Sequence, residues 1–338
     1  MTRRLPRLFT VAALMCALAA MSAPRLGAYL KLGSTVGTST VSLKWATSPV
    51  RYFVNSGSVP GVSADAFRGA LDRAFHTWQD VPTSSVAFEF AGYTDAQPLD
   101  DDNISTLGFV RRPDLDRVLA STNFLIDTRT GQILESDVFF NSIYSWSAAD
   151  PGVEGYYDLQ SIATHEIGHF QGLGHSALGE TDLRPGGGRR LIAAAAVMFP
   201  IAYASGSTTG RALTPDDIAG TSDIYPDAGF RDTTGSIEGR VTLNGKGVYG
   251  AHVVAYHMQT GALVGNFTLD DSGFFVIAGL QEGPHVLRVE PLDDADVESF
   301  FDDSSRVEQG FTPLIYDKIV VVPRGGAAPS VTVTVIGR

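Results

Sequence analysis

The sequence predicts two folded units in series, a mixed α+β domain followed by an all-β domain. With 338 residues, 44% of them hydrophobic and 18% charged, the chain is globular in composition and longer than one typical domain. Helix-like and strand-like apolar patterns mix up to residue 226, and from residue 235 short β-rich runs alternate with glycine turns. We therefore expect domains at residues 43–228 and 235–338, joined by a linker at 229–234.

The first 23 residues have the features of a secretory signal. Three arginines (Arg3, Arg4 and Arg7) precede an apolar run over residues 8–21, and small residues follow it. That run is too short and wrongly flanked for a membrane span. We expect cleavage after Ser22 or Ala23, a short N-terminal segment at 24–42, and a secreted, extracellular protein without a membrane span.

Cysteine content and charge narrow the class further. The one cysteine, Cys16, lies within the expected signal, so the exported chain has no disulfide, which favours a bacterial source. The net charge of -12 argues against nucleic acid as a partner, and we expect a monomer. The acidic runs at 100–102 and 293–303 are either calcium loops or solvated turns; without alternating ligand spacing, solvated turns are favoured.

In the first domain, residues 43–54 predict a strand, and a helix then begins at an N-cap, Ser63. Strands are expected at 85–90 and 106–111, and a hairpin joins 122–127 to 133–141 around the turn TRTGQ. One apolar face of the helix should lie on the sheet, formed by Phe67, Ala70, Leu71, Ala74, Phe75 and Trp78.

A second helix is expected at about 158–170, ending at Gly172 or Gly174, where a left-handed conformation costs little. Beyond the linker, which should allow the two halves some independence, the predicted strands lie in GSIEGRVTL, AHVVAYHM, GFFVIAG, HVLRVEP and SVTVTVIGR.

Residues 165–175, HEIGHFQGLGH, carry the chemistry. His165 and His169 lie one helical turn apart on one face, so both imidazoles can reach one metal ion. Gly172 lets the backbone leave the helix and return His175 as a third ligand. Three neutral imidazoles leave a fourth position open for water, which is typical of a catalytic rather than a structural zinc site.

Glu166 completes this interpretation. Zinc lowers the pKa of a bound water to about 7, and Glu166 can accept the proton of that water and pass it to the leaving amine. The alternatives are histidines without a metal on an amphipathic helix, or a non-catalytic zinc site. A carboxylate beside the first ligand has no use in a structural site, so the reaction predicted is peptide hydrolysis with one zinc ion.

The pattern HExxHxxGxxH is the motif of the metzincin metallopeptidases, and Ser176, Met198 and Pro200 make this chain resemble the matrixin branch. The resemblance implies a twisted mixed sheet with a long N-terminal helix and a motif helix. It places Met198 beneath the zinc ligands and makes Gly172, Met198 and Pro200 structural supports of the site. Residues 213–226 resemble the last helix of a matrixin catalytic domain.

The same resemblance also reveals departures. Residues 137–146 resemble the segment where animal matrixins carry ligands for a second zinc and for calcium, but Phe139, Asn141 and Ser142 stand there. We therefore expect a single zinc. By resemblance, the strand at 136–140 would edge the cleft and pair with substrate, and residues 200–213 would wall the pocket. The interval between His175 and Met198 is longer than usual, with an expected mobile tip at 186–190.

The second half resembles carboxypeptidase regulatory-like or transthyretin-like β-sandwich modules, and it would act as a binding module or as a stabilising spacer. We expect a secreted zinc metalloendopeptidase that hydrolyses extracellular proteins or peptides. One alternative is an adhesion or matrix-binding protein in which the β-sandwich has the main role. Another is a selective enzyme that processes one partner, or itself near Arg189 and Arg190.

Overall fold

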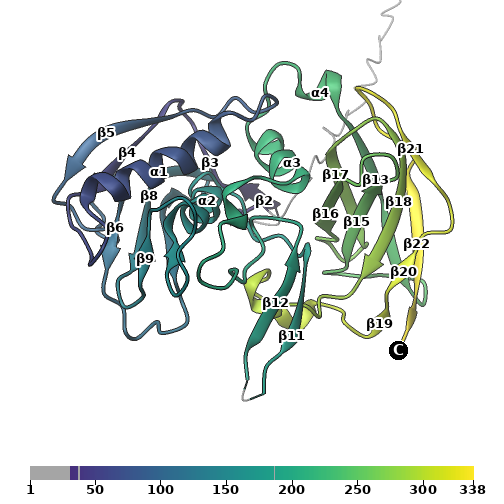
Figure 1. Ribbon diagram of the computed structural model, residues 1–338. Helices are drawn as coiled ribbons and strands as arrows, with labels where there is room; N and C mark the ends of the chain where they lie inside the picture. Colours follow the sequence, from purple (N-terminus) through teal and green to yellow (C-terminus); the bar gives the residue numbers. More distant parts are fainter. Residues whose placement is uncertain (1–30, 37–38, 186) are drawn as a thin grey trace, which may run out of the picture.

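The computed structural model describes residues 31–36, 39–185 and 187–338. The chain forms two sheet-containing halves side by side, with helix α3 between them (Figure 1). The expected signal, residues 1–23, lies outside the described residues, as do parts of the short segment that follows it. No helix among the described residues is long and apolar enough to cross a membrane.

The N-terminal half is built on a six-stranded mixed sheet. Its order is β3-β8-β6-β4-β5, with β7 paired to β8; only the β7–β8 pair is antiparallel. The strands are β3 (Lys44–Trp45), β4 (Val50–Asn55), β5 (Phe88–Thr94), β6 (Thr106–Val110), β7 (Ala120–Asp127) and β8 (Gln132–Asn141). Small two-stranded sheets are formed by β1 (Gly33–Val36) with β2 (Ser39–Ser42), and by β9 (Trp146–Ser147) with β10 (Tyr157–Asp158).

Helix α1 (Ala64–Gln79) packs against the sheet as the sequence predicts. The side chain of Ser63 accepts a hydrogen bond from Ala66 N, which confirms the predicted N-cap. All six residues of the predicted apolar face are buried, and they share one core with α2 (Leu159–Phe170) and strands β4, β6 and β8. The core is aromatic: the rings of Tyr52 and Phe75, for example, stack 3.9 Å apart.

Two strand predictions are corrected. The single strand expected at 43–54 is two strands, β3 and β4, because residues 46–49 bend away and Pro49 has no N–H to donate. The strand expected at the cleft edge, 136–140, is wrong: β8 is bonded on both sides, to β7 and to β6, so β7 is the edge strand. The antiparallel hairpin of β7 and β8 itself confirms the turn at TRTGQ.

After α2, the chain forms a projecting hairpin and then α3 (Pro215–Ile224). The hairpin of β11 (Gly179–Leu183) and β12 (Arg189–Ala194) extends away from both halves, at the bottom of Figure 1. Helix α3 begins with Pro215 at its first position and two acidic residues in its first turn, which suits a helix N-terminus. Between them lies the one-turn helix η1 (Thr209–Arg211).

The C-terminal half, residues 235–338, has two five-stranded sheets that share one core. We call these two packed sheets the double sheet. One sheet contains β13 (Gly235–Leu243), β14 (Lys246–Gly247), β17 (Phe274–Leu280), β19 (Phe311–Thr312) and β22 (Val331–Gly337). The other contains β15 (His252–His257), β16 (Leu263–Phe267), β18 (Gly283–Glu290), β20 (Leu314–Ile315) and β21 (Val320–Val322). Burial alternates along β22, so one face of that strand is inside.

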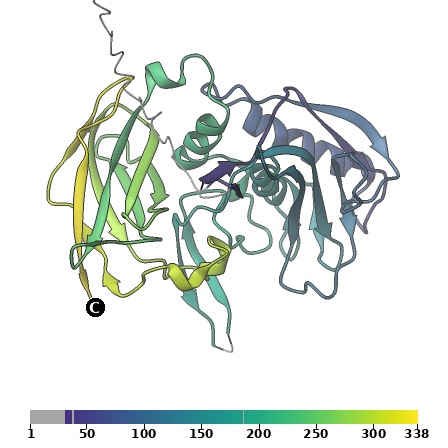
Figure 2. The same cartoon turned by 180° about the vertical axis from the view of Figure 1, so that it is seen from behind.

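The two halves are in close contact, unlike the independence expected from the linker. The linker holds a short helix, α4 (Phe230–Thr233), and Ala219 of α3 belongs to the core of the double sheet. A second cluster joins the halves around Phe199, Phe267 and Phe300. Seen from both sides, the yellow-green segment that carries η2 (Val297–Ser299) leaves the double sheet and reaches the base of the β11–β12 hairpin (Figures 1 and 2).

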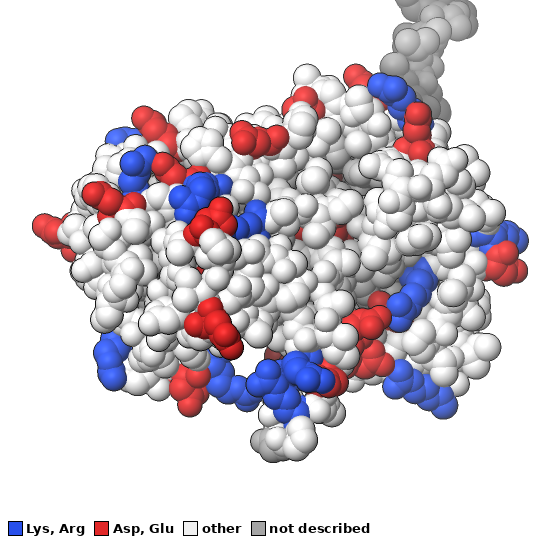
Figure 3. Space-filling model, in the orientation of Figure 1, with Lys and Arg blue, Asp and Glu red and all other residues white. Residues whose placement is uncertain are grey.

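The face of the molecule drawn in Figure 3 carries scattered charges of both signs. Neither sign forms a continuous stripe there, although basic side chains gather over the projecting hairpin.

Candidate metal centre

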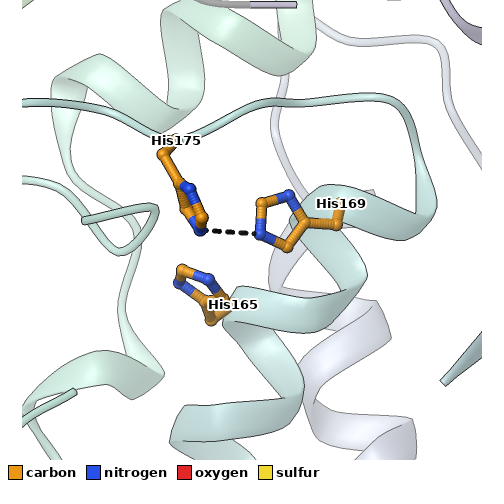
Figure 4. A group of neighbouring side chains, drawn as sticks. All are labelled: His165, His169 and His175. Carbon is orange, nitrogen blue, oxygen red and sulfur yellow. Dashed lines mark hydrogen bonds between the residues drawn. The ribbon is translucent and has the colours of Figure 1, made fainter. Parts of the chain in front are cut away.

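Three imidazoles converge at one point beside the end of α2. His165 and His169 come from the helix and His175 from the loop after it, and their rings face one another (Figure 4). One ligand atom from each lies within 4.8 Å of the others, and the Nε2 atoms of His169 and His175 are 3.2 Å apart. Within the described ranges, no other group of three or more His, Cys, Asp or Glu side chains is close enough to hold an ion.

The second ring nitrogen of each histidine is hydrogen-bonded to a main-chain carbonyl. Nδ1 of His165 contacts Val197 O at 2.8 Å, and Nδ1 of His169 contacts Leu173 O at 2.8 Å. Nδ1 of His175 lies 2.6 Å from Ser299 O, across the boundary between the halves. Carbonyl oxygens only accept, so each Nδ1 carries the hydrogen and each Nε2 presents a lone pair.

Converging lone pairs fit a cation. Two Nε2 acceptors cannot hydrogen-bond to each other, whereas one divalent ion can bind both, and three imidazoles are a familiar donor set for zinc. The pKa values agree with neutral rings. Burial lowers the pKa of His165 to about 3 and that of His169 well below its ordinary value; burial also lowers the pKa of His175. Neutral imidazole is the form that binds metal.

Glu166 lies beside the triad in a nearly dry position. Its side chain is buried on α2, and burial raises the pKa of its carboxyl to about 7. The hydroxyl of Thr122, on edge strand β7, donates to Glu166 Oε2 at 2.7 Å and also approaches Glu166 O at 3.1 Å. The hydroxyl therefore ties the carboxylate to the edge of the sheet.

A tight turn at Met198 lies under the motif helix. Met198 is fully buried, and a Cβ placed on Gly168 would overlap its Sδ atom, so a larger residue at that point of α2 would force Met198 to move. The carboxylate of Asp217, in α3, accepts hydrogen bonds from Val197 N at 2.9 Å and Met198 N at 3.2 Å. Asp217 thereby fixes the turn whose carbonyl holds His165.

The remaining predicted supports also lie around the site. Gly172 has a φ of 105°, and a side chain there would overlap Leu43 O, so the backbone leaves the helix at this glycine rather than at Gly174. Pro200 is half-buried just after the Met198 turn.

Residues 137–146, where no second metal ion is expected, contain an asparagine that is held by several hydrogen bonds. The Asn141 amide nitrogen donates to Arg112 O, Leu115 O and Val118 O at 2.9–3.1 Å. Asn141 therefore organises the loop before β7 through its own side chain, and Phe139 is buried in β8.

The expected mobile tip at 186–190 is corrected in part. Gly186 lies outside the described residues, but Arg189 and Arg190 begin strand β12. There Arg190 pairs with Asp182 at 2.6 Å, and Arg189 lies 3.6 Å from Asp296.

Two contributors to the site had no signal in the sequence, and a third had only a partial one. Thr122 lies 44 residues from Glu166, Ser299 lies 124 residues from His175, and each reaches the site only through the tertiary fold. Asp217 had a partial signal, because TPxD at 214–217 is typical of a helix start.

Comparison with known proteins agrees with this geometry. The family model for matrixins matches residues 44–185. Metalloendoproteinase 2-MMP of Arabidopsis thaliana is 28% identical over 184 residues, 49% of this chain and 39% of that protein. Matrix metalloproteinase-16 of Rattus norvegicus is 30% identical over 141 residues, and the human protein of that name is 29% identical over 136; each alignment covers 39% of this chain and 22% of the relative.

Among solved structures, the Bacillus anthracis TIE protein and the minor pilin GBS52 of Streptococcus agalactiae each cover 31% of this chain with a TM-score of 0.20, at 13% and 16% identity. The matched regions cover 17% of the TIE protein chain and 45% of the GBS52 chain. The chain spans well under half the length of the curated relatives it matches. Residues 44–185 therefore form a matrixin domain, of a family that depends on zinc.

Proposed function

We propose that this chain is a secreted zinc endopeptidase of the metzincin clan, with His165, His169 and His175 as ligands and Glu166 as general base. The convergence of three Nε2 lone pairs beside a buried carboxylate carries the proposal. The matrixin match over residues 44–185 supports it independently. The substrates would be extracellular proteins or peptides, and one zinc ion would serve each monomeric chain.

When bound, zinc supplies a Lewis acid that acidifies water and polarises the peptide carbonyl. Glu166 accepts the proton of the attacking water and delivers it to the leaving amine. Thr122 keeps Oε2 of that carboxylate in place. Edge strand β7, which is paired on its other side with β8, offers its free backbone groups to an extended substrate. Residues 200–213, rich in small side chains, would line the adjoining pocket.

The remaining parts of the chain take their roles from this function. Residues 1–23 would direct export, and residues 43–228 would be the peptidase domain with Gly172, Met198 and Pro200 as supports. A linker at 229–234 would lead to residues 235–338, a module of the carboxypeptidase regulatory-like or transthyretin-like kind. Its support is the pair of five-stranded sheets around one core.

The test is cleavage of an unfolded protein by the purified full chain, with Glu166→Gln and Glu89→Gln compared. Glu89 is an exposed carboxylate in β5, far from the triad in sequence. We expect wild type and Glu89→Gln to cleave equally, and Glu166→Gln to lose about 100-fold or more in kcat. Zinc content should be near one ion per chain in all three. A chelator should abolish cleavage, and added zinc should restore it.

Two results would overturn the proposal. Undiminished cleavage by Glu166→Gln would remove the general base, and purified wild type that neither retains nor takes up zinc would remove the metal site.

A further inference from the structure

The third histidine differs from the other two in the source of its hydrogen-bond partner. The carbonyls that hold His165 and His169 come from Val197 and Leu173, within the N-terminal half. The carbonyl that holds His175 comes from Ser299, at the end of η2 in the C-terminal half. This bond, 2.6 Å long, is the shortest of the three.

A second link joins the same loop to the double sheet. Asp216, fully buried at the start of α3, accepts a hydrogen bond from the hydroxyl of Ser176 at 2.6 Å. Its other carboxylate oxygen accepts from Gly265 N, in β16, at 2.7 Å. Ser176 follows His175 in the chain, so the loop is held both at the imidazole and at the next residue.

The segment that carries Ser299, residues 291–310 between β18 and β19, is itself anchored. The side chain of Phe300 is buried, and its ring centroid lies 5.6 Å from that of Phe267 in β16. Its ring centroid also lies 6.2 Å from that of His175, in a T-shaped arrangement. Further back, Asp294 accepts from Thr181 N at 3.1 Å, and its carbonyl accepts from the Thr181 hydroxyl at 2.5 Å. The segment is thus fixed to the double sheet at one point and to the projecting hairpin at another.

We propose that the double sheet is a positioning element of the metal centre, acting on the third ligand through the carbonyl of Ser299 and through the Gly265–Asp216–Ser176 chain. The Nδ1 hydrogen bond fixes the tautomer and the ring orientation of His175, so that the Nε2 lone pair meets the ion. The other two ligands keep their own partners. This inference rests on the proposed metal site and adds a role for residues 235–338 within it.

The test uses the full chain and measures metal binding rather than turnover. Because Ser299 acts through its main chain, its position is changed through Phe300, its neighbour in the segment. Phe300→Ala should raise the dissociation constant for zinc, measured by chelator competition, by about 10-fold or more. It should also change the visible absorption spectrum of the Co²⁺-substituted protein. Phe300→Leu should restore most of the affinity.

Phe311→Ala is the matched control, because Phe311 is fully buried in the core of the double sheet and does not belong to the segment. It should lower thermal stability but leave the zinc affinity of the folded protein and the cobalt spectrum unchanged. A second pair of variants, with smaller structural changes, keeps the test decisive if Phe300→Ala does not fold. Asp294→Ala should weaken zinc binding several-fold, whereas Asp293→Ala, which removes only an exposed ion pair with Arg338, should not.

Equal zinc affinity in Phe300→Ala and wild type, with identical cobalt spectra, would overturn the inference while leaving the proposed peptidase intact. Equal weakening by Phe311→Ala would also overturn it, because the effect would then be general destabilisation. Failure of wild type to bind zinc would instead refute the proposed function itself.

Discussion

At the scale of single residues, the candidate site depends on one hydroxyl that the family motif does not contain. Thr122 holds the carboxylate of Glu166 from the edge strand. Thr122→Val keeps the shape but removes the donor, so we expect kcat for peptide cleavage to fall about 10-fold with KM little changed. Thr122→Ser, which keeps the donor, should stay close to wild type. Loss of zinc from Thr122→Val, or equal losses in both variants, would contradict a positioning role.

Gly168 offers a test of packing under the motif helix. Alanine is ordinarily favoured over glycine inside a helix by about 1 kcal/mol. At Gly168, however, the new Cβ would overlap Met198 Sδ and lie 2.9 Å from Trp78 Cζ2, and both neighbours are fully buried. We expect Gly168→Ala to lower the free energy of unfolding by about 1–2 kcal/mol in urea denaturation.

Gly69→Ala is the control for this prediction. Gly69 lies inside α1, where a Cβ would contact only Arg73 Nη1 at 3.6 Å. That substitution should stabilise the protein by up to about 1 kcal/mol. If Gly168→Ala stabilised the protein, the Met198 turn would have to move at little energetic cost, and the prediction would be contradicted.

The sequence could predict the ligands but not what orients them. His165 and His169 are brought together by helix geometry alone, and Gly172 returns the chain over a few residues. Those relations are local. Thr122 and Ser299 reach the site only after the sheet and the two halves have assembled, and a carbonyl can come from any residue type, so neither had a signal in the sequence.

At the scale of elements, the motif helix α2 depends on the buried carboxylate that begins it. Asp158 accepts from Ser161 N at 2.9 Å as N-cap, and Arg211 contacts both its oxygens at 2.6 and 2.8 Å. Burial would raise the pKa of Asp158, but the hydrogen bonds from Arg211 and Ser161 outweigh it and the pKa is lowered. The folded state therefore binds this proton more weakly than the unfolded chain.

Asp158→Asn should destabilise the protein by about 2–4 kcal/mol at pH 7, because Arg211 loses its buried partner. Since the folded pKa is depressed, the stabilisation is complete above the unfolded value of about 4 and is lost as pH falls through the folded pKa. Urea denaturation between pH 7 and pH 3 should show the difference from wild type shrinking below about pH 4. Asp150→Asn is the control, because Asp150 meets the same Arg211 but is 82% exposed. A pH-independent difference would contradict the assignment.

Secondary-structure elements were predicted best where a single apolar periodicity and a single capping residue determine them. Helix α1 combined Ser63 with a continuous apolar face, so its position followed from the sequence. The edge of the sheet did not, because β7 and β8 both mix apolar and polar residues, and the order of strands depends on pairing between distant segments. In the structure β8 is almost entirely buried and β7 only half-buried, but the residue types of the two strands do not indicate that difference.

At the scale of the whole molecule, contacts between the halves predict cooperative unfolding. Ala219 of α3 lies in the core of the double sheet, and the cluster of Phe199, Phe267 and Phe300 spans the boundary. The linker composition suggested independence, but composition says nothing about the buried faces on either side of a linker. We expect one unfolding transition for the full chain rather than two.

The three tryptophans make this measurable, because Trp45, Trp78 and Trp146 all lie in the N-terminal half. Tryptophan fluorescence then follows that half, whereas far-UV circular dichroism follows both. Phe311 lies in the other half, 165 residues or more from each tryptophan. Phe311→Ala should lower the free energy of unfolding by about 3–5 kcal/mol and shift the urea midpoints of fluorescence and of dichroism equally. Ile315→Ala, at an exposed position of the other five-stranded sheet of the C-terminal half, should move neither. If Phe311→Ala shifted only the dichroism signal, the two halves would unfold separately. The contacts between the halves would then be too weak for the double sheet to position His175.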